Sequence, residues 1–147
     1  MAKIERSIDI NSDWTAVDAV ALDGGRLAEW YAGVESSQAD GTYPQPGGKA
    51  KMVYKAAGMS FDLTFTVLEY VPGDHILFQL EGGILKGTSR WTHMPVPGGT
   101  RLTNVLDYET QGGGLGAIAD RLLLERMNTS QMEKSLENLK ALVESGQ

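Results

Sequence analysis

The sequence contains no cysteine, and this absence removes several kinds of chemistry at once. A chain without thiols has no disulfide, no thiol nucleophile and no cysteine-ligated metal site. Histidine is also scarce: His75 and His93 are the two in the chain, and neither shares metal-ligand spacing with a second histidine or an acidic pair. We therefore expect no metal site, and no grouping of serine, histidine and acid indicates a catalytic triad.

Positive charge is in short supply as well. Lys and Arg number 13 against 19 Asp and Glu, for a net charge of -6, and the basic residues form no run. Nucleic-acid binding depends on clustered Lys and Arg, so the composition argues against a nucleic-acid partner. No stretch approaches the ~20 apolar residues of a membrane span, and the first residues contain no apolar signal region. A cytoplasmic location is therefore expected.

The overall composition is that of a globular protein. The chain has 147 residues, of which 41% are hydrophobic and 22% charged. This length fits one domain with a sizeable core, and the sequence shows no internal repeat or low-complexity tract. We expect one domain over residues 1–147, present as a monomer or a homodimer.

The stretch from Gly112 to Gln147 predicts one long amphipathic helix. Seven of nine positions along one seam are apolar, and the seam consists of Leu115, Ile118, Leu122, Glu125, Thr129, Met132, Leu136, Leu139 and Val143. A helix of this length needs a broad apolar surface to cover its seam. Glu125 and Thr129 are the two polar seam positions, one turn apart, so their side chains can reach the same spot.

The residues before this helix predict an antiparallel sheet. Ile4, Ile8 and Ile10 alternate with polar residues in a first strand, and Arg6 interrupts its apolar face. Two short helices follow, the first after the capping residues Asn11–Asp13 and the second over Arg26–Trp30. Six extended runs come next, separated by turns too short for crossover helices. The expected fold class is α+β with a seven-stranded antiparallel sheet.

Residues 114–119 match the pattern G-x-G-x-x-A, which binds dinucleotides when it follows a strand and opens a helix. That chemistry also needs a returning parallel strand with an acidic residue at its end. Here the predicted helix simply continues toward residue 147. We interpret the glycines as a hinge and expect no cofactor.

The order of these elements resembles the helix-grip fold of the START and birch-pollen-allergen superfamily, including its polyketide cyclase/dehydrase and coenzyme Q-binding branches. The residues that carry the resemblance are Ile8–Trp14, Trp30, Gly98–Thr103 and Leu136–Leu142. The chain has Asn11-Ser12 where the family often has Ala-Pro. The resemblance implies that the sheet wraps around the long C-terminal helix and leaves an apolar cavity, which in the family holds lipids, sterols, polyketides, quinones or plant hormones.

Such a cavity predicts which residues would contact a ligand. The apolar walls are expected from the dry face of the sheet and from the helix, at Phe61, Leu63, Phe65, Phe78, Trp91, Leu106, Tyr108 and Leu122. The polar candidates are Arg6, Asn104, Glu125 and Thr129. Two interpretations stay open for Glu125 and Thr129, which either line the cavity or lie at the solvated edge of the helix. Arg6 either meets Glu125 or a ligand carboxylate, or extends from an edge strand into solvent.

Three functions are compatible with this sequence. The first is binding or carriage of a small hydrophobic molecule without catalysis. The second is a cyclase or dehydrase acting in the same cavity, with Glu125, His93 or Arg6 as acid/base groups. The third is a protein-interaction module of the co-chaperone or ribosome-associated type. The absence of a convincing acid/base pair in the sequence favours the first.

Overall fold

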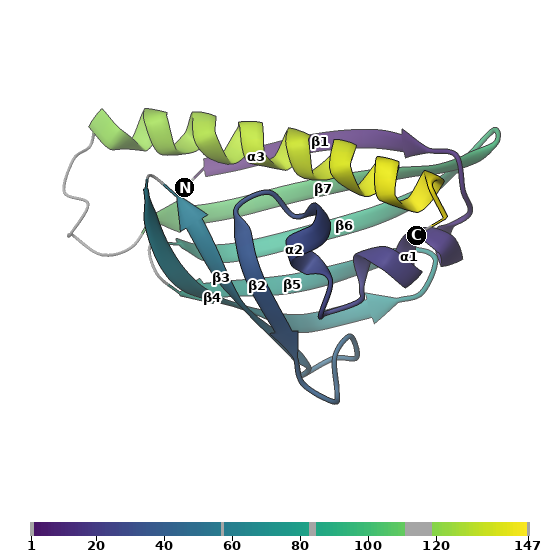
Figure 1. Ribbon diagram of the computed structural model, residues 1–147, viewed down its shortest axis with the longest axis horizontal. Helices are drawn as coiled ribbons and strands as arrows, with labels where there is room; N and C mark the ends of the chain where they lie inside the picture. The colour runs from purple at the N-terminus through teal and green to yellow at the C-terminus, as the bar shows by residue number, and fades with distance from the viewer. Residues whose placement is uncertain (1, 57, 83–84, 111–118, 147) are drawn as a thin grey trace.

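The computed structural model describes residues 2–56, 58–82, 85–110 and 119–146 of the chain (Figure 1). Its helices and strands follow in the order β1 (Ala2–Ile10), α1 (Trp14–Ala21), α2 (Leu27–Trp30), β2 (Val34–Ala39), β3 (Lys49–Ala56), β4 (Met59–Val71), β5 (His75–Gly82), β6 (Leu85–Val96), β7 (Gly99–Thr110) and α3 (Ala119–Glu144).

The seven strands form one antiparallel sheet in the order β1-β7-β6-β5-β4-β3-β2. Strands β2 to β7 are a meander, in which each strand pairs with the next along the chain. Strand β1 adds to the far edge by pairing with β7, so that Ile4 lies opposite Leu106 and Ile8 opposite Leu102. The predicted α+β class and the seven-stranded sheet with two short helices after its first strand are confirmed.

Local sequence explains where the first helix begins and how two of the turns close. The Asp13 side chain accepts a hydrogen bond of 3.0 Å from the Ala16 backbone amide and so caps α1. Gly73 and Gly98 adopt φ angles of 80° and 81° in the β4–β5 and β6–β7 turns. Most residues with a side chain are strained in this left-handed region, so glycine is favoured at these positions.

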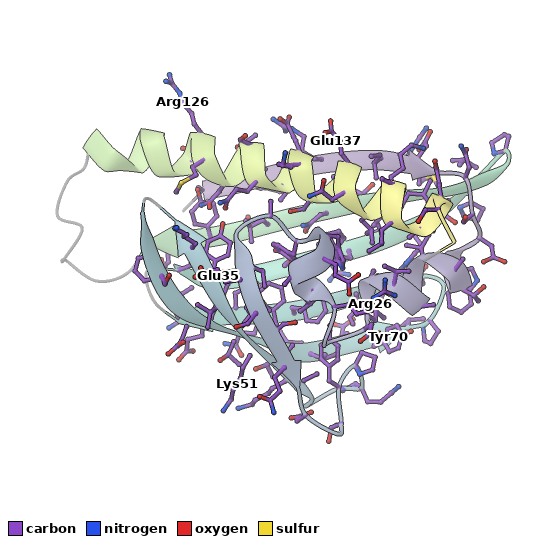
Figure 2. All side chains as sticks on the ribbon, viewed as in Figure 1. Arg26, Glu35, Lys51, Tyr70, Arg126 and Glu137 are labelled. Carbon is purple, nitrogen blue, oxygen red and sulfur yellow. The ribbon has the colours of Figure 1, made fainter. Side chains whose placement is uncertain are left out.

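The core lies between the inner face of the curved sheet and the helices. Helix α3 runs along β1 and contacts α1 and α2, which lie over the sheet beside it (Figure 1). Met132, Leu136, Leu139 and Val143 are its buried apolar residues among those described. Arg126 and Glu137 project from α3 away from the sheet (Figure 2). The seam from Met132 to Val143 therefore faces the sheet, as its periodicity predicts.

A β-bulge in β4 determines which side chains reach the interior near α1. Phe61, Leu63, Phe65 and Val67 alternate toward the inner face, and the register between β4 and β5 then shifts between Val67 and Glu69. The extra residue, Leu68, is exposed. Because a bulge moves the alternation by one position, Tyr70 rather than Glu69 points inward, where its hydroxyl lies 3.4 Å from Asp18 Oδ2.

Candidate ligand site between the sheet and the helices

Two small cavities lie side by side in the interior among the described residues. The first, here called the His93 cavity, has a volume of about 20 Å³ and is enclosed by α1, α2 and the inner faces of β4 to β7. The second, the Asn128 cavity, has a volume of about 30 Å³ and lies between α3 and the inner faces of β3 to β7. Each has room for about one water molecule.

Aromatic side chains form the partition between the two cavities, because Tyr31 and Trp91 line both. Their ring centroids lie 6.5 Å apart. Trp91 also packs edge-to-face against Trp30 with a centroid distance of 5.8 Å, and Tyr31 does the same against Phe65 at 5.9 Å. These separations are typical of favourable aromatic pairs. Tyr31 and Trp91 therefore lie at the boundary that the two cavities share.

The His93 cavity contains a buried acid and base. His93 Nε2 lies 2.7 Å from Asp18 Oδ1, and the two side chains are 3% and 10% exposed. Asp18 comes from α1 and His93 from the inner face of β6. The second ring nitrogen, His93 Nδ1, is buried without a hydrogen-bond partner among the described residues, and so is Trp30 Nε1. Burial, reinforced by the nearby Asp18, also raises the pKa of Tyr43 in the cavity wall.

The Asn128 cavity has a polar wall where α3 faces the sheet. The Tyr54 hydroxyl donates a hydrogen bond of 3.3 Å to Asn128 Oδ1 and also contacts Gln131 Oε1. Burial raises the pKa of Tyr54. Tyr108 also hydrogen-bonds to Asn128. Asn128 acts there as a hydrogen-bond donor, which lowers the pKa of Tyr108 against the larger effect of burial, which raises it.

On the sheet side of the Asn128 cavity, the Ser89 hydroxyl donates to Asn104 Oδ1 over 3.0 Å, and both residues are buried. On the helix side, the Ser135 hydroxyl accepts a hydrogen bond of 2.8 Å from the Ala32 backbone amide. Ser135 thereby ties α3 to the chain directly after Tyr31, one of the two partition residues.

Six of the sequence-predicted contact residues line the cavities, namely Leu63, Phe65, Phe78, Trp91, Asn104 and Leu106. Phe61 and Tyr108 lie in the same core but are not part of either lining. The side chain of Leu122 lies outside the described residues, as do residues 115 and 118 of the predicted seam. That any of the sequence-predicted residues contacts a ligand stays a prediction.

Glu125 and Thr129 are placed differently from the cavity-lining interpretation. Together with Arg126, Ser130 and Glu133 they border an open surface depression, separate from both cavities. The Thr129 hydroxyl donates to the Glu125 backbone carbonyl over 2.9 Å, within its own helix. At this level of the helix the buried position is taken by Asn128, which lies between them in sequence.

Arg6 also lies outside the cavities. Its Nε atom is 2.9 Å from Glu133 Oε2, and both side chains are about half exposed. It does not meet Glu125, because β1 is the edge strand and a long side chain there reaches past the helix into solvent. Of the interpretations left open for Arg6, the pairing with Glu125 is not seen, and contact with a ligand stays a prediction.

The sequence reasoning missed three functional candidates that the fold brings to the cavities: Asp18, Asn128 and Gln131. A signal for two of them was present. Asp18 lies four residues after Trp14 and three before Ala21, so it shares a face of the predicted first helix with these two apolar residues. Asn128 and Ser135 are one heptad apart and share a helix face, which the chosen seam left out. In the described part of the chain, no group of three or more His, Asp or Glu residues could hold a metal ion.

Comparison with known proteins decides the family of this chain. The family model described as "Polyketide cyclase / dehydrase and lipid transport" matches residues 1–144. The chain belongs to this family. The match covers nearly the whole chain and confirms the resemblance to the START and helix-grip proteins. No curated protein matches the sequence.

Solved structures of similar fold include members with and without a named activity. The Zhui aromatase/cyclase from Streptomyces sp. R1128 matches with a TM-score of 0.82 and 16% identity, covering 97% of this chain and 93% of that one. A START superfamily protein from Mycobacterium smegmatis matches at 0.77 and 16%, covering 99% of both chains. A protein from Thermus thermophilus matches at 0.81 and 21%, again over 99% of both. At these identities the likeness shows the fold. None of the described helices is long and apolar enough to cross a membrane.

Proposed function

We propose that this chain binds or carries a small hydrophobic molecule in the space now divided into the His93 and Asn128 cavities. The observation that carries the proposal is the pair of apolar-walled cavities between sheet and helices, separated by Tyr31 and Trp91. Membership in a family of polyketide cyclases, dehydrases and lipid transporters supports a hydrophobic ligand. A buried apolar site of this kind gains affinity from the apolar area that the ligand removes from water.

Titration with an apolar fluorescent dye tests this proposal directly. We expect saturable binding that a hydrophobic competitor reverses. Leu63→Trp on β4 would fill the Asn128 cavity and should weaken dye binding at least tenfold. Leu68→Trp is the matched control, because Leu68 lies on the same strand but is exposed at the bulge. If folded wild-type protein shows no saturable binding, or if both variants bind like wild type, the proposal is wrong.

The His93–Asp18 pair favours a second candidate, an enzyme of the cyclase or dehydrase type that acts in the same space. When the hydrogen lies on Nε2 and is donated to Asp18, Nδ1 of His93 carries a lone pair that can act as a base. Because Nδ1 has no partner among the described residues, it is free to remove a proton from a bound substrate, for example from carbon next to a carbonyl group.

Proton exchange separates the two candidates. A base at Nδ1 would exchange the hydrogens next to the carbonyl of a bound ketone for deuterium, and NMR would follow the loss of their signals. His93→Gln keeps a polar side chain without the imidazole base and should abolish the protein-dependent part of the exchange. An exchange rate no higher than that of buffer alone, with ketone shown to be bound, leaves binding as the function.

A further inference from the structure

The two edges of the sheet differ in how their outward main-chain groups are bonded. Strand β1 forms one edge, and side chains cover its outward carbonyls. The Arg6 guanidinium donates a hydrogen bond of 2.8 Å to the Glu5 carbonyl, and Lys140 Nζ on α3 donates one of 2.7 Å to the Asp9 carbonyl. These carbonyls are the groups that an added strand would need, so the β1 edge is closed to further pairing.

Strand β2 forms the opposite edge and lacks this cover (Figure 1). The Asp40 amide donates to the Lys49 carbonyl of β3 over 3.0 Å, which fixes the direction of the main-chain groups along β2. Because these groups alternate in direction along a strand, those of Gln38 face β3, and those of Ser37 and Ala39 face away from it. Within the described part of the chain, no side chain bonds to these outward groups.

A side chain at the same point of the edge also lacks a partner. The Ser37 hydroxyl is buried without a hydrogen bond to any described residue. Ser37 pairs with Met52 of β3, which is 3% exposed, so Ser37 points toward the inner face of the sheet. Buried hydroxyls are nearly always hydrogen-bonded, and a strand added at this edge would bring a partner within reach.

The charges along the β2 edge complement those of a second copy. An open depression of about 330 Å³ at one end of β2 is lined by Gln38, Ala39, Asp40, Lys49 and Lys51. Main-chain amides engage its acid, Asp40, and neither lysine forms a salt bridge with a described residue. Glu35 is exposed toward the other end of β2 (Figure 2), where it accepts a hydrogen bond from Ser60. An antiparallel pair of β2 strands would place each Glu35 beside the lysines of the other copy.

We propose that the β2 edge is a self-association surface, on which two copies of this chain pair their β2 strands antiparallel about a two-fold axis at Ser37. In this register the two Ser37 residues exchange main-chain hydrogen bonds, and their hydroxyls lie opposite each other on the inner side. Glu35 of each copy lies opposite Ala39 of the other, at the wall of the lysine-lined depression. Because both β1 edges are closed, association stops at a dimer with one continuous sheet.

Sedimentation velocity over a wide range of protein concentration tests the association. Two six-residue strands make a small interface, so we expect a reversible monomer–dimer equilibrium. Ser37→Pro removes an outward amide and no bond to β3, and it should abolish the dimer. Ser7→Pro makes the same change on the closed β1 edge and should leave the dimer intact, with urea melts showing that both variants fold. A wild type that stays monomeric, or a dimer that survives Ser37→Pro, would overturn the proposal.

Disulfide trapping tests the register, and the absence of cysteine from the chain removes any background. Directly opposed residues that exchange main-chain bonds have Cα atoms about 5.5 Å apart, which a disulfide can span. Ser37→Cys should therefore give a covalent dimer on mild oxidation. Ser36→Cys is the matched control, because Ser36 is more exposed but lies opposite Gln38 of the second copy. The two thiols introduced at position 36 are then too far apart to be bridged.

A charge exchange tests which ends of the strands meet. Glu35→Lys and Lys51→Glu should each weaken the dimer by roughly two- to tenfold, the range for exposed ion pairs repeated by the two-fold axis. The double variant restores opposite charges and should regain most of the wild-type affinity. A double variant weaker than either single variant, or equal cross-linking of the two cysteine variants, would overturn the pairing about Ser37.

Discussion

His93 on β6 and Asp18 on α1 are joined by a hydrogen bond of 2.7 Å between Nε2 and Oδ1, across 75 residues of sequence. The bond fastens the first helix to the inner face of the sheet at the wall of the His93 cavity. It leaves the opposite ring nitrogen, Nδ1, without a partner in the described part of the chain. One contact thus links the packing of α1 to the chemistry that the cavity offers.

A double-mutant cycle measures this link. Asp18→Ala and His93→Ala should each lower the free energy of unfolding. The losses of the two single variants, added together, should exceed the loss in the double variant. We expect a coupling of about 1.5–3 kcal/mol, the range for a hydrogen bond to a charged group. Urea denaturation of the four proteins provides the measurement. A coupling near zero would mean that the pair does not hold α1 on the sheet.

Leu136 tests the packing of α3 on the sheet. It is 2% exposed, and truncation to alanine removes buried methyl groups and leaves a void. Leu136→Ala should lower the free energy of unfolding by roughly 2–5 kcal/mol. The adjacent Glu137 points away from the sheet (Figure 2), so Glu137→Ala should change stability by less than about 0.5 kcal/mol. Similar urea melts for both variants would contradict the orientation of the helix.

Tyr31 tests the partition between the cavities. Tyr31→Ala should join them into one space, so a bulky apolar dye should bind faster than it binds to wild type. Tyr31→Phe keeps the ring contacts with Trp91 and Phe65 and should behave like wild type. Stopped-flow fluorescence gives the association rates. Equal rates in all three proteins would show that the Tyr31–Trp91 contact does not limit entry.

Glu125 and Thr129 should not affect binding, because they border an open depression away from both cavities. Glu125→Gln and Thr129→Val are therefore expected to alter stability by less than about 0.5 kcal/mol and to leave dye affinity unchanged. A loss of affinity in either variant would place these two residues at the ligand after all.

His75 gives a prediction for pH. Hydrogen bonds to Asp74 and Glu69 raise the pKa of His75, opposed by partial burial and by Arg90, while the bond to His75 lowers the pKa of Glu69. The raised pKa means that charged His75 contributes stability that is fully present below its unfolded value of about 6.5 and is lost as pH rises through the folded value. Charged Glu69 contributes stability that is present above its unfolded pKa of about 4.5, and this stability is lost as pH falls through its lower folded pKa.

The two effects overlap between roughly pH 5 and pH 6.5, where both partners are charged. Urea denaturation of wild type and His75→Gln at pH 5.5 and pH 8 should show the stability advantage of wild type at the lower pH only. An advantage that is equal at both values, or larger at pH 8, would contradict the direction of the His75 shift.

The sequence was informative wherever one repeating pattern decided the structure. Alternation from Phe61 to Val67 indicated an inner face for β4, and the residues opposite it in β3 and β5 follow from antiparallel pairing. The helix seam was equally reliable from Met132 to Val143. At Glu125 and Thr129 the sequence left two interpretations open, and the structure places both residues at an open surface depression.

The cavities themselves could not be read in this way. Asp18, Trp30, His93 and Asn128 come from four separate elements, and nothing in local periodicity states which helix residue faces which strand residue. The bulge at Leu68 is a further example, since it decides that Tyr70 points toward Asp18 and Glu69 toward His75.

The sequence by itself determined the element order, the antiparallel sheet, the apolar face of α3 and the family, because these depend on short-range patterns and on the spacing of turns. Only the tertiary structure decided where the two cavities lie, that Tyr31 and Trp91 divide them, and which buried donors lack a partner among the described residues. Those features depend on the positions of side chains far apart in the chain, and close packing fixes these positions only when all the elements are assembled.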